Sequence, residues 1–205
     1  MILLASRSPQ RSMLLTRADI AFDVVSTDCT EEAIGGQSPE HLAVERAIAK
    51  ARSAKPNAAQ QVLLEERKGM ILGADTIAAL GRDIIGKPKD RNDARQILGR
   101  LAGTSHTVIT AHCGLSGCKD PNECMQSVAV ALARVTMREM SPKEIEAYCN
   151  SGESDDRAGA YAIQETGDQF VTELQGSWDT VVGLHVASVE RLWLELTGQH
   201  LRNAP

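Results

Sequence analysis

The chain has 205 residues, of which 42% are apolar and 24% charged, and its net charge is −5. These values are ordinary for a soluble globular protein that buries a sizeable core, and we expect one domain over residues 1–205. The acidic balance and the aromatic content of only 3% argue against nucleic acid as a partner, which calls for basic patches or stacking platforms.

Neither the first residues nor the apolar runs predict export or a membrane partner. The segment from Met1 to Ser6 is apolar but has no basic leader, so we expect no signal peptide. No apolar run is long enough to span a bilayer. Five cysteines are an odd number, and the spacing of Cys113, Cys118 and Cys124 fits no zinc site, so we interpret them as unpaired thiols. Together these features predict a cytoplasmic protein.

The first strand is predicted over residues 2–5 and is followed at once by a helix. Ser8 is a plausible N-cap, with Pro9 at the first helical position. A strand that leads into a helix N-terminus through Ser6, Ser8 and Arg11 suits an anion, because free N–H groups and the helix dipole attract phosphate. A capped helix with surface arginines explains the same residues equally well.

A second strand is predicted over residues 21–26, and an acidic cluster that includes Glu31 and Glu32 follows it. Such a cluster is usually a solvated loop, but it also offers an oxygen ligand to Mg²⁺. Ser38 and Pro39 then begin a helix whose apolar face continues to residue 51. Lys50 falls in its last turns, as a dipole partner or a phosphate ligand.

The stretch over residues 70–80 is the predicted centre of the fold. Its apolar start is typical of a strand buried on both faces, and Gly73 permits a close approach of another backbone. Asp75 and Thr76 then lie within or at the end of a core strand. A buried carboxylate must be paired, hydrogen-bonded or bound to a metal. The simpler interpretation is an aspartate that caps a turn.

The remaining pattern alternates strands and helices, with Lys87 held in an extended segment between a glycine and Pro88. Residues 56–61 are predicted to be a loop, and residues 62–69 are either a short helix or an excursion. Later elements are a helix over 90–101, a strand over 105–113, a hairpin loop over 114–126, a strand over 128–137, a helix from 142, a strand from 170 and a helix over 188–196. This order predicts an α/β fold with a mixed sheet.

Several polar residues at the predicted strand ends and helix starts suit a polyphosphate, because they combine cations, hydroxyls and an amide around one core carboxylate. They are Ser6, Ser8, Arg11, Lys50, Asp75, Lys87 and Gln164. The chain contains neither a Walker-type phosphate loop nor a dinucleotide fingerprint.

Five motifs in order resemble the Maf (septum-formation-inhibitor) family of nucleoside triphosphate pyrophosphatases, most closely its dTTP/UTP branch. The motifs are Leu4-Ala5-Ser6-x-Ser8-Pro9-x-Arg11, Gly73-Ala74-Asp75-Thr76, Gly86-Lys87-Pro88-Lys89-Asp90, Ala158-Gly159-Ala160-Tyr161-x-Ile163-Gln164 and Gly176-Ser177-x-x-x-Val181-Val182-Gly183-Leu184. The resemblance implies an elongated mixed sheet flanked by helices, with two lobes and a central cleft, as in inosine-triphosphate pyrophosphatases. It also implies hydrolysis between the α- and β-phosphates and a homodimer. We expect a divalent metal, Mg²⁺ or Mn²⁺, to assist this hydrolysis.

Carried over by position, the resemblance implies Asp75 as the proton acceptor, and we expect it to hold the metal as well. An acidic residue at Glu31 or Glu32 aligns loosely with the family, and Glu32 is our candidate for a second metal ligand. It implies Ser8, Arg11, Lys50 and Lys87 as phosphate-handling residues. Base choice is implied for Thr76, Gln164 and Gln10, and at Gln10 the chain departs from the arginine usual in the dTTP/UTP branch. Asp179 and His185 also depart, from the usual Asn and Pro.

We therefore expect an enzyme that cleaves dTTP and UTP in preference to purine triphosphates. A small hydroxyl at Thr76 and an amide at Gln164 suit a pyrimidine edge, although Gln164 capping a turn explains that residue too. Two alternatives stay open. One is a nucleotide-binding regulator of cell division, and the other is a pyrophosphatase for modified nucleotides such as methylated pyrimidine or guanosine triphosphates.

Overall fold

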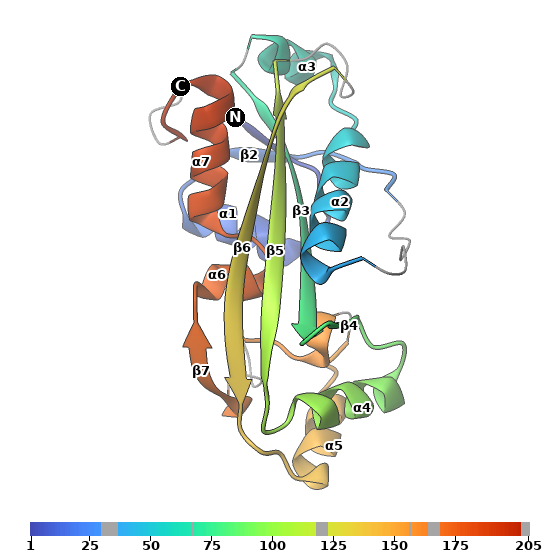
Figure 1. Ribbon diagram of the computed structural model, residues 1–205. Coiled ribbons are helices and arrows are strands. Elements are labelled where there is room, and N and C mark those ends of the chain that lie inside the picture. Colours follow the sequence, from blue (N-terminus) through green and yellow to red (C-terminus); the bar gives the residue numbers. More distant parts are fainter. Residues whose placement is uncertain (30–36, 67, 118–122, 156, 164–168, 202–205) are drawn as a thin grey trace. The chain divides into compact units, whose positions relative to one another are not determined.

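The computed structural model describes residues 1–29, 37–66, 68–117, 123–155, 157–163 and 169–201. Within these ranges seven strands form one mixed sheet in the order β2-β1-β3-β5-β6-β7, and β4 pairs with β3 beside this path (Figure 1). The strands are β1 (Ile2–Leu4), β2 (Phe22–Val24), β3 (Met70–Leu80), β4 (Asp83–Ile85), β5 (Ser105–Ser116), β6 (Met125–Met137) and β7 (Val171–Gln175).

Helices separate most of the strands along the chain, as the α/β prediction requires. They are α1 (Pro9–Arg17), α2 (Pro39–Arg52), α3 (Ala58–Glu65), α4 (Arg91–Leu101), α5 (Pro142–Ser151), α6 (Trp178–Val182) and α7 (Val186–Thr197), with a 3-10 turn η1 at Ala158–Ala160. The Ser-Pro starts of α2 and α5 are confirmed, because Ser38 and Ser141 accept hydrogen bonds from backbone N–H groups of the first turn. No helix in these ranges combines the length and apolar character that crossing a membrane requires.

The chain divides into two compact units, and β3, β5 and β6 contribute residues to both. The first unit comprises Met1–Asp75, Thr110–Ala131 and Gly183–Pro205. The second comprises Thr76–Ile109 and Leu132–Val182. The expectation of a single domain stays a prediction.

In the first unit, β1 lies between β2 and β3 and is parallel to both. Leu4 is paired with Leu72, so the segment after β1 starts level with the part of β3 that precedes Gly73. The residues of β1 and the first six of β3 are buried, as their apolar runs predict. The segment that follows β1 therefore starts beside Leu72 and Gly73, which lie within β3.

Two glycines let helices pack closely on the strands of this unit. A Cβ atom added at Gly73 would lie 2.2 Å from the Ala47 carbonyl oxygen and 2.6 Å from the Ala51 nitrogen, so α2 runs directly against β3 (Figure 1). A Cβ atom added at Gly114 on β5 would lie 2.7 Å from a methyl group of Leu196 on α7. A larger residue at Gly73 would force α2 away from β3, because backbone atoms occupy the space, whereas at Gly114 the side chains of Leu196 and Met70 would have to shift.

The second unit has its own apolar core, built from β4, α4, α5 and the ends of the long strands. Here β4 is antiparallel to β3, and β7 is antiparallel to β6. The rings of Tyr148 and Phe170 pack edge to face at 5.1 Å, and those of His106 and Tyr161 at 5.4 Å. The mixed parallel and antiparallel pairing confirms the predicted mixed sheet.

Three sequence-based expectations were wrong in detail. Residues 58–61 are the start of α3, because Asn57 and Gln60 cap each other and begin a helix there. The expected hairpin loop over 114–126 is shorter, since β5 continues to Ser116 and β6 begins at Met125. Cys124 is disulfide-bonded, whereas Cys113 and Cys149 are free thiols.

Candidate active site

Asp75 is the buried carboxylate of the first unit, 4% exposed and inside β3. Side chains two residues apart on a strand point to the same face, so Asp75 faces the same way as Gly73. Gly73 faces α2, where its missing side chain lets the helix backbone approach. The strand and the glycine therefore aim Asp75 at α2, and the interpretation as a turn cap is wrong.

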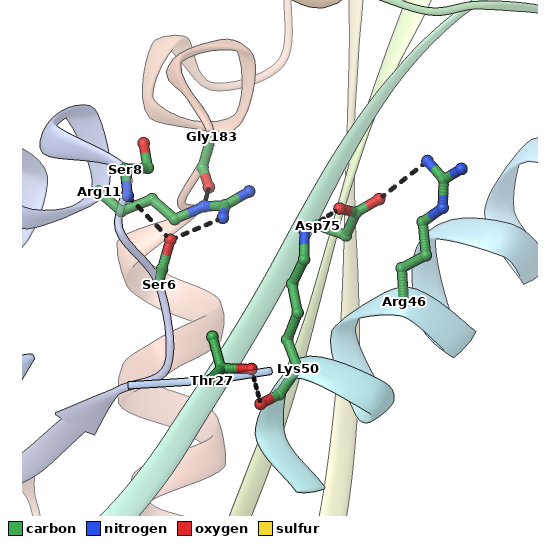
Figure 2. Close-up of polar contacts among 8 residues, drawn as sticks. All are labelled: Ser6, Ser8, Arg11, Thr27, Arg46, Lys50, Asp75 and Gly183. Atoms are coloured by element: carbon green, nitrogen blue, oxygen red, sulfur yellow. Dashed lines mark hydrogen bonds and ion pairs between the residues drawn. The ribbon is translucent and has the colours of Figure 1, made fainter. Parts of the chain in front are cut away.

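Lys50 on α2 meets this carboxylate. Its Nζ lies 2.5 Å from Oδ1 of Asp75, and the two side chains are only 11% and 6% exposed (Figure 2). A short charge-assisted hydrogen bond in a poorly solvated place is strong, and it offsets part of the desolvation of both groups. Both were predicted site residues, but they are 25 residues apart, and the sequence did not indicate that Lys50 and Asp75 pair with each other.

Arg46, which the sequence interpretation missed, approaches the other oxygen of Asp75. Its Nη1 lies 3.9 Å from Oδ2, so the contact is an ion pair but not a hydrogen bond (Figure 2). Arg46 stands four residues before Lys50 on α2, and that spacing places both on one helix face. Helical periodicity counted from Lys50 was the signal that could have found it.

The last turn of α2 is fixed from outside the helix. The hydroxyl of Thr27 donates to the carbonyl oxygen of Lys50 at 3.4 Å (Figure 2). The hydroxyl of Ser53 donates to the same oxygen at 3.2 Å. Carbonyls in the last turn of a helix need such partners, since no later N–H group reaches them. These bonds hold the backbone from which Lys50 extends to Asp75.

Ser6 organises a second polar group, where the chain leaves β1 and enters α1. Its Oγ accepts hydrogen bonds from the backbone N–H of Ser8 at 3.2 Å and from Nη1 of Arg11 at 3.0 Å (Figure 2). Arg11 is buried, and its Nε donates to the carbonyl oxygen of Gly183 at 2.9 Å. The structure thus brings Ser6, Ser8 and Arg11 together, as predicted, and adds Gly183.

Ser8 occupies the N-cap position of α1, but its side chain does not cap the helix. Its hydroxyl donates instead to Oε1 of Gln10 at 3.0 Å. The N-terminus of α1 therefore has no side-chain cap from Ser8, and free N–H groups at such a helix end attract anions. Gln10 is tied to this start of the helix rather than extended away from it.

The segment that supplies the Gly183 carbonyl is also fixed at His185. The backbone N–H of His185 donates to Nε2 of His112, a buried residue of β5, at 2.9 Å. Nδ1 of His185 lies 2.8 Å from Oγ of Ser188 in the first turn of α7. The unusual histidine at this position is therefore part of the packing that positions the acceptor of Arg11.

The other predicted site residues lie elsewhere in the chain. Thr76 follows Asp75 on β3 and is the first residue of the second unit. Lys87 belongs to the second unit as well, where it is exposed between β4 and α4. Gln164 and Glu32 lie outside the described residues.

The residues around Asp75 fit a divalent metal only as a partial site. Oδ2 of Asp75 is buried and has no hydrogen-bond partner among the described residues. The described ranges contain no group of three or more His, Cys, Asp and Glu side chains able to hold a metal ion. Mg²⁺ is commonly held by one or two carboxylates together with substrate phosphates, so one carboxylate oxygen suits it when a nucleotide supplies the rest.

Solved structures resemble this chain only weakly. A crystal structure of a nucleoside-triphosphatase/dITP/XTP pyrophosphatase from Mycobacterium abscessus aligns with a TM-score of 0.39 and 15% identity, over 68% of this chain and 74% of that chain. Similarity of this size carries no argument about the fold or the activity.

Sequence relatives are much closer and cover nearly the whole chain. A dTTP/UTP pyrophosphatase from Aquifex aeolicus is 37% identical over 195 residues, which are 95% of each protein. A dTTP/UTP pyrophosphatase from Dictyoglomus turgidum is 39% identical over 191 residues, which are 93% of each protein. The profile of the family described as Maf-like protein matches residues 1–196, and the chain therefore belongs to the Maf-like protein family.

Proposed function

We propose that the chain is a nucleoside triphosphate pyrophosphatase that hydrolyses dTTP and UTP to the monophosphate and pyrophosphate. The observation that carries the proposal is the buried Asp75 paired with Lys50, in the same unit as the Ser6–Arg11 group at the start of α1. Relatives that match more than nine tenths of this chain are named dTTP/UTP pyrophosphatases. A carboxylate beside several cations is the equipment that hydrolysis of a polyanion needs.

We assign to Asp75 the role of binding the attacking water. Its Oδ1 is held by Lys50, which leaves Oδ2 as the buried acceptor without a hydrogen-bond partner in the described ranges. A buried acceptor left unpaired is costly, so a water that donates a proton to Oδ2 is favoured there. In the proposed reaction Asp75 orients this water, or accepts its proton, as the water attacks the α-phosphorus in line with the leaving pyrophosphate.

Binding of the substrate phosphates is assigned to residues at the start of α1 and to Lys50 and Lys87. Ser8, Arg11 and Lys50 belong to the first unit and Lys87 to the second, and the family resemblance supports all four as phosphate-handling residues. Such groups neutralise the negative charge that develops on the phosphate oxygens during bond cleavage. Arg11 has a supporting task too, because its bonds to Ser6 and to the Gly183 carbonyl fix the loop that begins α1.

A divalent cation is part of the proposal, with Asp75 and Glu32 as its protein ligands. Support comes from the unpartnered Oδ2 of Asp75, while Glu32 rests on the family resemblance. Mg²⁺ or Mn²⁺ bound there supplies Lewis-acid stabilisation of the phosphate oxygens. Chelation by EDTA should then abolish turnover, and added Mg²⁺ or Mn²⁺ should restore it.

Base preference is assigned to Thr76, Gln164 and Gln10. A hydroxyl and an amide that pair with the carbonyls and imide N–H of a pyrimidine leave their own polar groups unpaired when another base binds, which penalises that base. In the structure Oε1 of Gln10 accepts a hydrogen bond from the Ser8 hydroxyl at 3.0 Å, at the start of α1.

A panel of triphosphates with a pyrophosphate readout tests the proposal. We expect dTTP and UTP to release pyrophosphate faster than ATP, GTP and CTP. Preferential cleavage of methylated guanosine triphosphates would replace the substrate assignment. Tight nucleotide binding without pyrophosphate release would favour the regulatory alternative, a nucleotide-binding protein of septum formation, and would overturn the enzyme assignment.

We also propose a homodimer in the cytoplasm. The dimer rests on the family resemblance. The free thiols of Cys113 and Cys149 support a reducing compartment, whereas the disulfide at Cys124 argues against one. Light scattering of the purified protein tests the dimer, because a mass of twice 22.1 kDa is expected.

A further inference from the structure

Arg46 and Asp75 face each other without completing a hydrogen bond. Nη1 of Arg46 is 3.9 Å from Oδ2 of Asp75, beyond hydrogen-bond reach. Nε of Arg46 and Oδ2 of Asp75 are both buried and have no hydrogen-bond partner in the described part of the chain. Leaving the buried N–H of a guanidinium unpaired is costly, so Arg46 favours a ligand that accepts its hydrogen bonds, while Oδ2 of Asp75 stays available to the attacking water.

The local charge favours an anionic ligand. Lys50 already holds Oδ1 of Asp75 at 2.5 Å, which neutralises the carboxylate. The guanidinium of Arg46 is always charged, so the three groups together carry one net positive charge (Figure 2). In a poorly solvated place such an excess attracts a negative group more strongly than it would at the surface.

Arg46 is also the more accessible of the two cations. Its side chain is 21% exposed, compared with 11% for Lys50. A guanidinium has five N–H donors in a planar fork, and this fork matches two oxygens of a phosphate group. Arg46 can therefore be reached by a dissolved polyphosphate while it remains next to Asp75.

We propose that Arg46 is a phosphate-binding residue of the active site, donating to oxygens of the bound triphosphate while Lys50 holds Asp75. This inference rests on the proposed function, since it assigns one more contact to the same substrate. It differs from a role in which Arg46 only positions Asp75. A positioning residue would change kcat and leave polyphosphate affinity unaltered, whereas a phosphate ligand changes affinity.

Calorimetric titration with inorganic tripolyphosphate, in the presence of Mg²⁺, separates these roles because it involves no base and no turnover. We expect Arg46→Gln to raise the Kd about 10-fold to 100-fold, the effect of losing a hydrogen bond to a charged group. Arg46→Lys keeps the charge but loses the fork, so its Kd should lie between those of wild type and Arg46→Gln. Steady-state kinetics with dTTP should show the same rise in KM and a kcat within about threefold of wild type.

Arg52→Gln is the matched control, because it removes the same charge from the same helix. Arg52 donates to Gln126 at 3.0 Å, on the exposed surface. The control should bind tripolyphosphate as wild type does. Thermal unfolding of all variants checks that α2 stays folded.

The outcomes separate the inference from the proposed function. Wild-type affinity in Arg46→Gln, or a loss of kcat at unchanged affinity, overturns the inference and leaves the pyrophosphatase assignment standing. If the wild type binds tripolyphosphate through Arg46 but releases no pyrophosphate from any nucleotide, the inference holds and the enzymatic function fails. A wild type that binds no tripolyphosphate and turns over no nucleotide contradicts both.

Discussion

Gly73 and Asp75 stand two residues apart on β3, and both face α2. The glycine brings the helix backbone so close that an added Cβ would lie 2.2 Å from the Ala47 carbonyl oxygen. The aspartate then lies within 2.5 Å of Lys50 on the next turn of the helix. Close packing of α2 against Gly73 thus sets the distance between the charged groups of Lys50 and Asp75.

Gly73→Ala is expected to damage both stability and activity. The added methyl group would collide with backbone atoms, which cannot rotate away as a flexible side chain can, so α2 must shift. We expect a loss of about 1–3 kcal/mol in the free energy of unfolding, measured in urea. The shift would also carry Lys50 away from Asp75, so pyrophosphate release should fall by more than the small fraction of unfolded protein explains.

Gly99→Ala is the control for this substitution. Gly99 lies within α4, and an added Cβ meets nothing within 4 Å. Alanine favours a helix interior over glycine by roughly 0.5–1 kcal/mol, so this variant should be as stable as wild type or more so. Equal effects of the two substitutions would show that the contact between Gly73 and α2 does not matter.

Lys50→Met is expected to destabilise the fold by leaving a buried carboxylate without its main partner. Removing one member of a buried ion pair typically costs about 3–5 kcal/mol. The double variant Lys50→Met with Asp75→Asn removes the unpaired charge, so it should be clearly more stable than Lys50→Met alone. Urea unfolding of the wild type, both single variants and the double variant measures this coupling. Strictly additive effects would mean that the two side chains do not interact.

Acid should lower the stability of the fold through protonation of His106, which is buried. Burial lowers the pKa of His106 to about 4 from an ordinary value of 6.5. Below pH 6.5 the unfolded chain takes up this proton and the folded protein does not, so stability declines from about pH 6.5 to pH 4. The full decline amounts to about 3 kcal/mol.

His106→Gln should remove most of this pH dependence. The amide can still hydrogen-bond to the Tyr161 hydroxyl, which lies 2.9 Å from Nε2 of His106. Hydrogen bonds from Ser141 and Arg138 lower the pKa of Glu144 to about 2, so its contribution is lost only below about pH 4.5. Comparing urea unfolding of the variant and the wild type between pH 7 and pH 5 separates His106 from the other histidines, and identical slopes for the two proteins would refute the assignment.

Gln10→Arg should raise the catalytic efficiency for dTTP and UTP more than for purine triphosphates. An arginine adds a bidentate donor beside the start of α1, where Gln10 now binds the Ser8 hydroxyl. A contact to phosphate worth about 1–3 kcal/mol corresponds to a gain of roughly fivefold to 150-fold in kcat/KM. Equal activity on dTTP, UTP, ATP and GTP, unchanged by the substitution, would contradict the assignment of base preference.

Side-chain patterns predicted much of this site, because the relevant signals were local. Ser6, Ser8 and Arg11 follow a short strand within one helical turn, and the structure brings them together. The bond from Arg11 to the Gly183 carbonyl had no such signal. Its acceptor is a backbone oxygen 172 residues away, and backbone atoms are the same at every position.

A glycine explains why the predicted end of one strand was wrong. Gly114 was interpreted as the start of a loop, yet it lies within β5 because Leu196 of α7 fills the space where its side chain would be. Glycine permits both a turn and a close approach, and only the packing partner decides between them. At Gly73 the same ambiguity was resolved by the apolar run that precedes it.

The central claim is that Asp75 directs water to the α-phosphorus of a nucleoside triphosphate. Hydrolysis of dTTP in ¹⁸O-labelled water, followed by mass spectrometry of both products, tests it most directly. We predict the label in dTMP and none in pyrophosphate, with turnover reduced about 10²-fold to 10⁴-fold in a folded Asp75→Asn variant. Label in pyrophosphate, release of dTDP with phosphate, or near-normal turnover by Asp75→Asn would contradict the claim.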